Sequence, residues 1–330
     1  MKQFLQKKAK LVFLCMLVLL TCTACANPRG RDGKTLADQI IASEETTIDA
    51  SKINYKDISD KKLKKEIKKN IKDGEYTIQP TTFKDSMSKG WFEGLIVWSI
   101  AQIINLISSK TDAGVGIILT TLLIQMLVFV FTRKSQMSTQ RMQEISPEIQ
   151  KIQNKYKDKT DERSKLQMAQ EMQNLYQKYD IHPFGSMLIT FIQLPIMMGM
   201  YYATMRSVSV VSGSFMGISL AGTPLDGFKA LDIAYIAIYV LMVIFYIVSM
   251  KLPQWLKKWQ DKKDNVKVKK YAQEETNPMA NSMNMSMYFM TAMICIMYIS
   301  WPMAMSFYWL VSSVIRVCQS LILHQVMNKK

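Results

Sequence analysis

Few side chains in this 330-residue sequence have the types and spacing that acid–base, nucleophilic or metal chemistry requires. It has two histidines, His182 and His324, and no carboxylate lies deep inside any of its long apolar segments. Proteolysis inside a membrane needs paired aspartates, a serine with a general base, or a zinc site, and the sequence offers none of these combinations. It also lacks a glycine-rich loop that could hold a nucleotide phosphate. We therefore expect no enzymatic activity, no metal site and no cofactor.

Four strongly polar side chains, three amides and one guanidinium, lie within apolar segments: Gln125, Gln193, Arg316 and Gln319. A polar group in hydrocarbon costs free energy unless a neighbour forms a hydrogen bond with it, so each of the four needs a partner. Arg316 precedes His324 by eight residues, which corresponds to about 12 Å of helix. We expect the Arg316 guanidinium to face protein or water rather than lipid. The alternative is that its side chain extends to the cytoplasmic surface.

The composition indicates a protein that crosses the membrane several times. Hydrophobic residues make up 49% of the chain and the formal net charge is +16, but the two are segregated into alternating apolar and lysine-rich blocks. A strongly basic chain can also bind nucleic acid. Here the lysines flank apolar segments, so attraction to anionic lipids and a cytoplasmic location of the basic loops explain the charge better.

Five apolar segments approach the length of about 20 residues that a bilayer crossing needs. They are Gly114–Thr132, Phe184–Met205, Ile233–Met250, Met285–Trp301 and Met303–Leu323. The loops between them differ in charge, because residues 133–183 hold ten lysines and arginines, residues 251–284 hold eight and residues 206–232 hold two. Basic loops stay in the cytoplasm. Five spans after an exported N-terminus place both basic loops and the C-terminus there.

Residues 90–109 are long enough for a further span, but their pattern favours an amphipathic helix along the outer leaflet. Ser99, Gln102 and Asn105 are three residues apart and form one polar stripe. Trp91 and Trp98 are typical of the membrane interface. A sixth span would also turn both basic loops outward.

The first 24 residues have the plan of a secretory signal peptide, with the basic start "MKQFLQKKAK" before the apolar "LVFLCMLVLLTC". Cys25 follows the small residues Thr23 and Ala24, which resembles the lipid attachment site of bacterial lipoproteins. We expect a lipidated, palmitate-bearing N-terminus, and the alternative is an uncleaved first transmembrane helix. Cys22 and Cys25 form C-T-A-C, but this setting argues against a redox motif.

Residues 25–89 are predicted to form an extracytoplasmic polar segment without a convincing core. Within it, the sequence from Ser59 to Gly74 is typical of one solvated helix, capped by Ser59 or Asp60 and ended by Gly74. A thin apolar stripe recurs every four residues, at Leu63, Ile67 and Ile71. Such a helix would serve as a spacer or rest against lipid headgroups.

The first basic loop, residues 133–183, is predicted to fold as an antiparallel helical hairpin. Apolar residues recur at intervals of three and four in two series, Met142, Ile145, Ile149, Ile152 and Tyr156, then Met168, Met172, Leu175 and Tyr179. Thr160 or Asp161 could cap the second helix. His182 precedes Pro183, which favours a hinge over proton chemistry.

In the second basic loop, residues 251–284, Trp255 and Trp259 are four residues apart. This spacing predicts one face of a helix held at the membrane surface. Nucleic-acid binding is the alternative for this basic and aromatic patch.

Several motifs together resemble the YidC/Oxa/Alb family of membrane insertases. They are "GWFEGLIVWSIAQIINL", "TRKSQMSTQRMQ", "PEIQKIQNKYKD", "QEMQNLYQKYDIHPFGSMLITFIQLPIMMGMYYA" and "FYWLVSSVIRVCQS", and the resemblance extends from Gly90 to the C-terminus. The most specific positions are Gln193 with Pro195 in the second span and Tyr308 with Trp309 in the last.

The resemblance implies an all-α membrane protein whose core, residues 110–330, has five transmembrane helices around a hydrophilic groove. In that family a nascent membrane protein moves from the cytoplasm along the groove into the bilayer, without ATP hydrolysis. The residues implied to line the groove or contact the substrate are Gln125, Arg316, Gln193, Gln319, Tyr308 and Trp309. The alternative is an assembly scaffold for a specific membrane complex that retains the fold without inserting proteins.

The resemblance also implies partners and a location. Nascent membrane proteins and lipids would be the main partners, with the Sec translocon and the ribosome as candidates and no other nucleic acid. The protein would span the bacterial cell membrane, lipid-anchored outside at Cys25, with its C-terminus in the cytoplasm.

One position departs from the family pattern. Many bacterial members carry an arginine in the first span, and the resemblance aligns that arginine with the uncharged Gln125. Gln125 lies eight residues before Arg133, and Arg316 lies eight residues before His324 on a span of the same direction. Both would lie about 12 Å deep. We therefore hypothesise that the positive charge of the groove has moved from the first span to the last.

Overall fold

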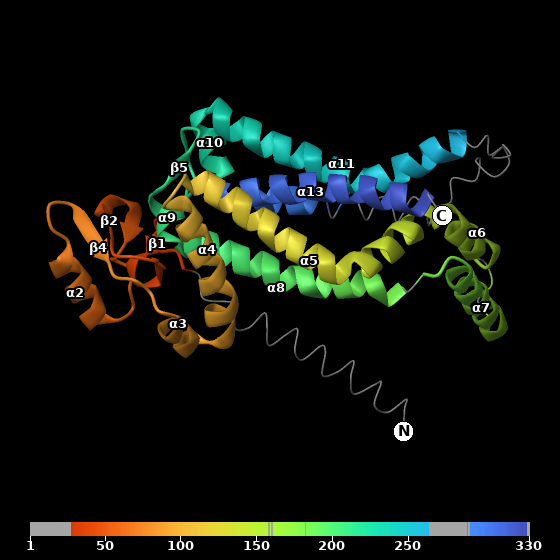
Figure 1. Cartoon of the computed structure of the whole chain (residues 1–330), viewed down its shortest axis with the longest axis horizontal. Coiled ribbons are helices and arrows are strands. Elements are labelled where there is room, and N and C mark those ends of the chain that lie inside the picture. Colours follow the sequence, from red (N-terminus) through yellow and green to blue (C-terminus); the bar gives the residue numbers. More distant parts are fainter. Residues whose placement is uncertain are drawn as a thin grey trace, which may run out of the picture. The chain divides into compact units, whose positions relative to one another are not determined.

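The computed structural model describes residues 28–157, 159, 161–181, 183–263, 289 and 291–328. Most of them are helical, as expected for an all-α membrane protein (Figure 1). The signal segment, Cys25, Thr160, His182 and residues 264–288 lie outside the described residues. The chain divides into two compact units. Unit 1 is Met1–Gln102 with Met197–Ser212, and unit 2 is Ile103–Ile196 with Gly213–Lys330.

Unit 1 is built from short strands and helices. They are β1 (Thr35–Leu36), the 3-10 helix η1 (Ala37–Gln39), β2 (Thr46–Asp49), the 3-10 helix η2 (Ala50–Lys52), β3 (Ile53–Asn54), α2 (Lys61–Asn70), β4 (Glu75–Ile78), α3 (Phe83–Lys89), the π-helix η3 (Glu93–Trp98) and α9 (Val208–Ser212). β1 pairs in parallel with β3. β2 pairs in antiparallel with β4, where Ile48 lies opposite Tyr76.

Unit 1 has an apolar core, so the prediction of a polar segment without one is wrong. The buried side chains of this core are Ala37, Ile40, Ala42, Ile48, Ile53, Ile58, Ile67, Ile78, Val208 and Val211. Most of them stand alone between polar residues in the sequence. Val208 and Val211 come from a part of the chain far from the others. Burial of this apolar surface is what holds the unit together.

Helix α2 is part of this core and not a free spacer. The Asp60 carboxylate caps it by accepting hydrogen bonds from the backbone N–H groups of Lys62 and Leu63. Ile67 is 3% exposed, and Leu63 packs against the same core. The apolar stripe that could have touched lipid is therefore used inside the protein.

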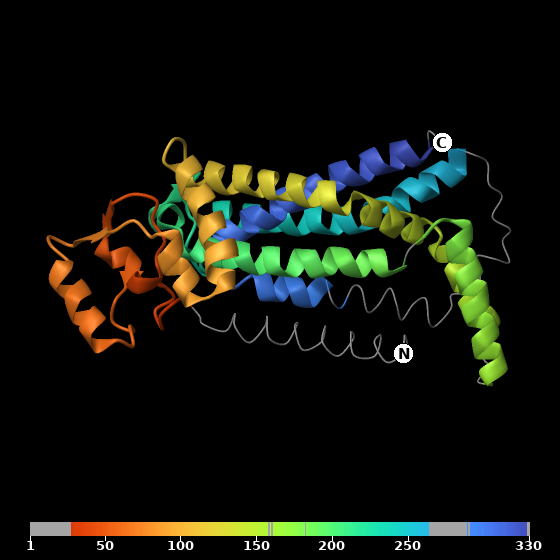
Figure 2. The same ribbon diagram turned by 60° about the horizontal axis from the view of Figure 1, so that its bottom comes forward.

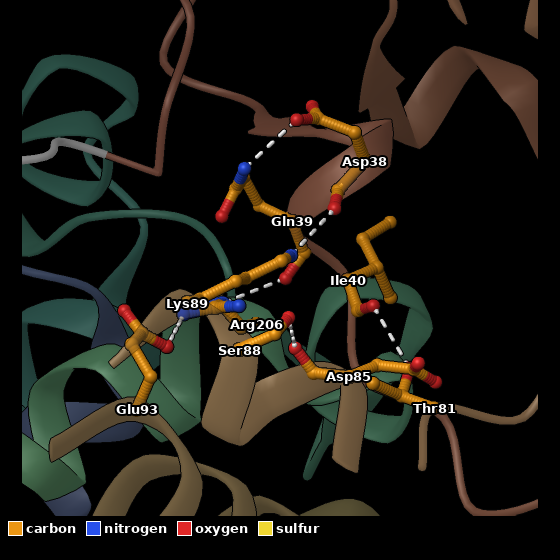
Figure 3. Close-up of polar contacts among 9 residues, drawn as sticks. All are labelled: Asp38, Gln39, Ile40, Thr81, Asp85, Ser88, Lys89, Glu93 and Arg206. Atoms are coloured by element: carbon orange, nitrogen blue, oxygen red, sulfur yellow. Dashed lines mark hydrogen bonds and ion pairs between the residues drawn. The ribbon is translucent and has the colours of Figure 1, made fainter. Parts of the chain in front are cut away.

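Arg206, the last residue of α8 (Pro183–Arg206), is buried in unit 1 among polar partners (Figure 3). Its Nε donates to the Gln39 carbonyl at 2.7 Å, and its Nη1 pairs with Glu93. The Arg206 carbonyl accepts a hydrogen bond from the backbone N–H of Ile41 at 2.6 Å. These interactions satisfy a backbone carbonyl at the C-terminal end of α8 and also pair the buried charge of Arg206. Burial, followed by the nearby Arg206 charge, lowers the pKa of Lys89 in this cluster.

Unit 2 consists mainly of long helices (Figures 1 and 2). Its elements are the end of α4 (Ser99–Ser108), α5 (Ala113–Glu144), α6 (Ser146–Lys155), α7 (Glu162–Lys178), the part of α8 up to Ile196, β5 (Ser214–Phe215), β6 (Ile218–Ser219), α10 (Pro224–Ala230), α11 (Ile233–Lys263) and α13 (Met303–Asn328). α13 packs against both α5 and α11, and the three helices run side by side.

Three described helices are long and apolar enough to cross a membrane: Ala113–Met142, Ile233–Gln260 and Met303–Val326. They coincide with the first, third and fifth predicted spans. α8 covers the second predicted span with 24 residues, and residues 291–298 of the fourth are helical. α5 and α11 continue beyond the predicted ends of their spans, and Pro253 lies inside the continuation of α11.

The helical hairpin is confirmed by α6 and α7. Ile145, Leu175 and Ile181 form its buried apolar contact. The Tyr179 hydroxyl donates to Glu148 at 2.7 Å and the Tyr156 hydroxyl donates to Glu171 at 2.8 Å, which fixes an antiparallel arrangement.

Charged side chains stabilise the hairpin's second helix at its N-terminus and near its middle. Asp161 caps α7 by accepting a hydrogen bond from the Ser164 N–H. Hydrogen bonds from Lys155 and then from Tyr156 lower the pKa of the Glu171 carboxyl. The contribution of Glu171 to stability is therefore present above its unfolded pKa and is lost as the pH falls through the folded value.

The helix predicted between residues 90 and 109 is present as η3 and α4, and Gln102 of its polar stripe forms hydrogen bonds within unit 1. The Gln102 amide donates to the carbonyls of Ala42 and Thr81, at 3.1 and 3.3 Å. The Trp98 indole also donates to Thr81, at 2.8 Å. Polar side chains of this helix satisfy buried backbone carbonyls, a role that amphipathic periodicity alone does not distinguish from solvation.

We predict that Ile67→Ala lowers the free energy of unfolding of unit 1 by about 2–5 kcal/mol, because it leaves a cavity in the core. Amide hydrogen exchange in β2 and β4 should accelerate accordingly. The neighbouring exposed residue gives a matched control, since Glu66→Ala should change stability by less than about 0.5 kcal/mol. Equal exchange in the two variants would contradict the packing of α2 on this core.

Candidate functional site

A polar cavity of about 220 Å³ lies among helices of unit 2. Its lining residues come from α5, α8, α11 and α13: Gln125, Val128, Gln136, Thr139, Gln140, Ile189, Gln193, Ser249, Pro253, Arg316, Gln319, Ser320 and Leu323. All four strongly polar residues that the sequence places inside apolar segments are among them. Gln125 and Arg316 thus face one cavity, as expected from their equal distances to the ends of their spans.

Gln125 has a partner on another helix. Its side chain is 7% exposed, and its Nε2 donates to the Ser312 hydroxyl at 3.2 Å. The bond joins α5 to α13 and offsets part of the cost of placing an amide among apolar side chains.

Arg316 is the one charged side chain among the described residues that line the cavity. Its guanidinium lies over the Trp309 ring, with Cζ 5.6 Å from the ring centroid. Its Nη2 is buried and receives no acceptor from the part of the chain that the structure describes. A guanidinium with a free donor, and no carboxylate among these lining residues, can bind an incoming acidic group.

Trp309 holds its place through an aromatic cluster. Its ring stacks on Tyr298 with centroids 4.9 Å apart and meets Tyr246 of α11 edge-on at 6.3 Å. The ring is 6% exposed and does not line the cavity itself. Trp309 therefore contacts the Arg316 guanidinium without lining the cavity.

Tyr308 also lies behind the lining. It is fully buried, and its hydroxyl accepts a hydrogen bond from Nε2 of Gln193 on α8 at 3.0 Å. The pair links α8 to α13 as Gln125 and Ser312 link α5 to α13. Four of the six predicted groove residues line the cavity: Gln125, Gln193, Arg316 and Gln319. The other two contact lining residues, Tyr308 through Gln193 and Trp309 through Arg316.

Three lining residues that were not predicted lie on the continuation of α5: Gln136, Thr139 and Gln140. They lie beyond Arg133, where the predicted span had ended. Gln140 Nε2 donates to the Ser320 carbonyl of α13 at 3.3 Å. Helical spacing could have identified two of these lining residues. Gln136 and Gln140 lie eleven and fifteen residues after Gln125, which is close to three and four turns of one helix.

The partners on α13 follow one stripe. Tyr308, Ser312, Arg316 and Ser320 are four residues apart and therefore share one face of the helix. Each contacts a different side chain: Gln193, Gln125, Trp309 or Gln140. Across residues 28–263 and 289–328, apart from the few undescribed positions, no cluster of histidine, cysteine and carboxylates suited to a metal ion was found.

Comparison with known proteins gives consistent matches. Residues 105–330 match the family model described as "60Kd inner membrane protein". The chain is 30% identical over 237 residues to "Membrane protein insertase YidC 1" of Streptococcus pyogenes serotype M6, covering 72% of this chain and 75% of that protein. It is 30% identical over 237 residues to "Membrane protein insertase YidC" of Enterococcus faecalis, covering 72% and 76%. For "Membrane protein insertase MisCA" of Bacillus subtilis the identity is 27% over 238 residues, covering 72% and 80%.

We predict that Gln125 and Ser312 are energetically coupled. A double-mutant cycle with Gln125→Leu and Ser312→Ala, followed by unfolding in detergent, should give a coupling energy of about 0.6 kcal/mol, as is typical of hydrogen bonds between membrane helices. Ser313→Ala is the matched control, because Ser313 is buried next to Ser312 and its hydroxyl has no hydrogen-bond partner among the described residues. The same coupling to Ser313 would contradict the assigned bond.

Proposed function

Because the chain belongs to the YidC/Oxa/Alb family of membrane protein insertases, we propose that it moves nascent membrane proteins from the cytoplasm into the bilayer. The observation that supports this proposal is the cavity, which Arg316 lines together with Gln125, Gln193 and Gln319. No acidic residue is among the described residues that line it. Such a site attracts an acidic group and holds it only weakly, because one charge is surrounded by uncharged amide, hydroxyl and apolar side chains. That combination suits transient contact with a passing polypeptide.

In this proposal five helices cross the membrane: α5, α8, α11, the segment that contains residues 291–298, and α13. The hairpin of α6 and α7 and the basic end of α11 are cytoplasmic, as is the C-terminus. Unit 1 is on the outer side, with Cys25 as its lipid anchor. Cytoplasmic contacts with a ribosome then fall to the hairpin and to the second basic loop.

The proposed insertion step needs no bond making and no ATP. A client's acidic tail enters the polar cavity from the cytoplasm and meets the Arg316 guanidinium. Its apolar segment leaves sideways into lipid, and the burial of apolar surface supplies the driving force. The polar lining lowers the cost of moving the tail, since amide and hydroxyl groups replace part of its hydration.

Arg316 takes the role that the family assigns to an arginine in the first span. Gln125 keeps a polar group at the original position, where it bonds to Ser312 and not to a substrate charge. This departure favours a specialised member of the family. An assembly scaffold that does not insert proteins is the competing function, and it predicts that rescue of an insertase-depleted strain fails even with the wild-type chain.

We predict that Arg316→Ala impairs insertion of acidic-tailed clients by on the order of tenfold to a hundredfold, equivalent to one lost charge-assisted hydrogen bond of about 1.5–3 kcal/mol. Gln125→Ala should be milder, because it removes a bond between helices and no charge. Arg316→Lys, which keeps the charge without the planar fork, should fall between them. The measurement is growth rescue and tail translocation in an insertase-depleted strain. Equal activity of Arg316→Ala and wild type would refute the role of Arg316.

We predict that Trp309 acts through Arg316. Trp309→Leu removes the ring under the guanidinium and should slow insertion of acidic-tailed clients by roughly twofold to thirtyfold, equivalent to a cation–π energy of about 0.5–2 kcal/mol. Trp309→Phe keeps a ring face and should retain most activity. In the Arg316→Ala background, Trp309→Leu should cost nothing further. An equal loss with neutral-tailed clients would instead indicate a general packing defect.

A further inference from the structure

The lysine face of α2 is a feature of unit 1 that the insertion cavity does not explain. We define it as the exposed residues Lys61, Lys62, Lys65, Lys68 and Lys69. α2 holds six lysines and only one acidic residue, Glu66. The rest of residues 28–102 holds eleven acidic and eight basic side chains. Positive charge is thus concentrated on one helix of a unit that is otherwise slightly acidic, which points to an anionic partner.

The lysine face has little of the apolar surface with which an interfacial helix inserts between lipid headgroups. Interfacial helices bury an apolar face with tryptophan, phenylalanine or leucine between the headgroups. In α2 that face is occupied, because Ile67 and Leu63 pack on the core of unit 1. The exposed large hydrophobic residues of the described chain include none between Asp60 and Ile71. The face is therefore suited to a hydrated polyanion more than to a membrane.

The spacing of the lysines fits an extended acidic polypeptide. Lys61, Lys65 and Lys68 follow one another at steps of four and three residues, so neighbouring Cβ atoms are about 5–6 Å apart. Alternate side chains of an extended chain lie about 6.6 Å apart on one side. Within unit 1, both views place α2 at an edge (Figures 1 and 2), and the five lysines of its lysine face are exposed.

We propose that the lysine face binds acidic segments of client proteins after they have crossed to the outer side. This inference rests on the proposed insertase function and on the outer location of unit 1. The chemistry of the clients supports it, because segments that cross the membrane are poor in lysine and arginine and are therefore rarely repelled by a cationic surface. Exposed ion pairs are individually weak and screened by salt, so several act together and the client is released readily.

The test uses the full chain in proteoliposomes, with a photo-reactive residue replacing Lys62 and two clients that differ only in an acidic or a neutral tail. We expect the acidic tail to crosslink to position 62 after translocation, and the crosslink to fade at high salt. Lys61→Gln, Lys65→Gln and Lys68→Gln combined should lower the yield roughly threefold to a hundredfold, if each lysine contributes as an exposed ion pair. Glutamine keeps the helix propensity high, so α2 should persist.

The matched control removes three charges elsewhere in unit 1, by Lys56→Gln, Lys72→Gln and Lys84→Gln, and should leave the crosslink unchanged. Equal yields for the acidic and neutral tails, equal loss in both triple variants, or crosslinks to lipid in place of the client would overturn the inference. Insertion of the neutral-tailed client distinguishes a failure of this inference from a failure of the proposed insertase function. If the wild type inserts it normally and position 62 still captures no acidic tail, only this inference fails. If the wild type inserts neither client, the proposed function fails and takes this inference with it.

Discussion

The arrangement of unit 2 depends on hydrogen bonds that pair polar side chains buried among apolar helices. α13 supplies the partners for two other helices, α5 and α8, through one stripe with a step of four residues. Tyr308 accepts from α8, Ser312 accepts from α5, and the Ser320 carbonyl accepts from the continuation of α5. In lipid, helices associate through close packing and hydrogen bonds, and these bonds help to fix the packing of α13 on α5 and α8. The cavity lies where these bonds leave polar groups facing one another.

Unit 1 depends on the same kind of pairing at the end of α8. A helix ends with unsatisfied carbonyls, and Arg206 adds a buried charge at that point. The chain around Gln39 and Ile41 satisfies both, since it accepts from the Arg206 side chain and donates to the Arg206 carbonyl. Glu93 then neutralises the charge. Because these contacts join residues more than 100 positions apart, unit 1 forms only when the end of α8 is available to it.

The sequence predicted those features that depend on local periodicity or on distance along one helix. The hairpin, the Asp161 cap and the shared cavity of Gln125 and Arg316 belong to this class. The core of unit 1 could not be predicted, because isolated isoleucines such as Ile48 become buried only against Val208 and Val211. Amphipathic periodicity also failed at Gln102, since a polar stripe fits buried carbonyls as well as water. The lining residues beyond Arg133 were missed because a span was ended at its first charge, whereas a helix ends only where its backbone geometry changes.

An arginine supported by a tryptophan has a physical advantage over one supported by a carboxylate. A carboxylate within the cavity would compete with every acidic client and would occupy the guanidinium donors directly. An aromatic face stabilises the cation through the ring quadrupole and needs no hydrogen bond, so the donors around the guanidinium plane are left for the client. Trp309, fixed by Tyr298 and Tyr246, meets this requirement, and Arg316 Nη2 has no acceptor among the described residues. The proposed transfer of the charge from the first span to the last therefore depends on an aromatic support for Arg316 in place of an acid.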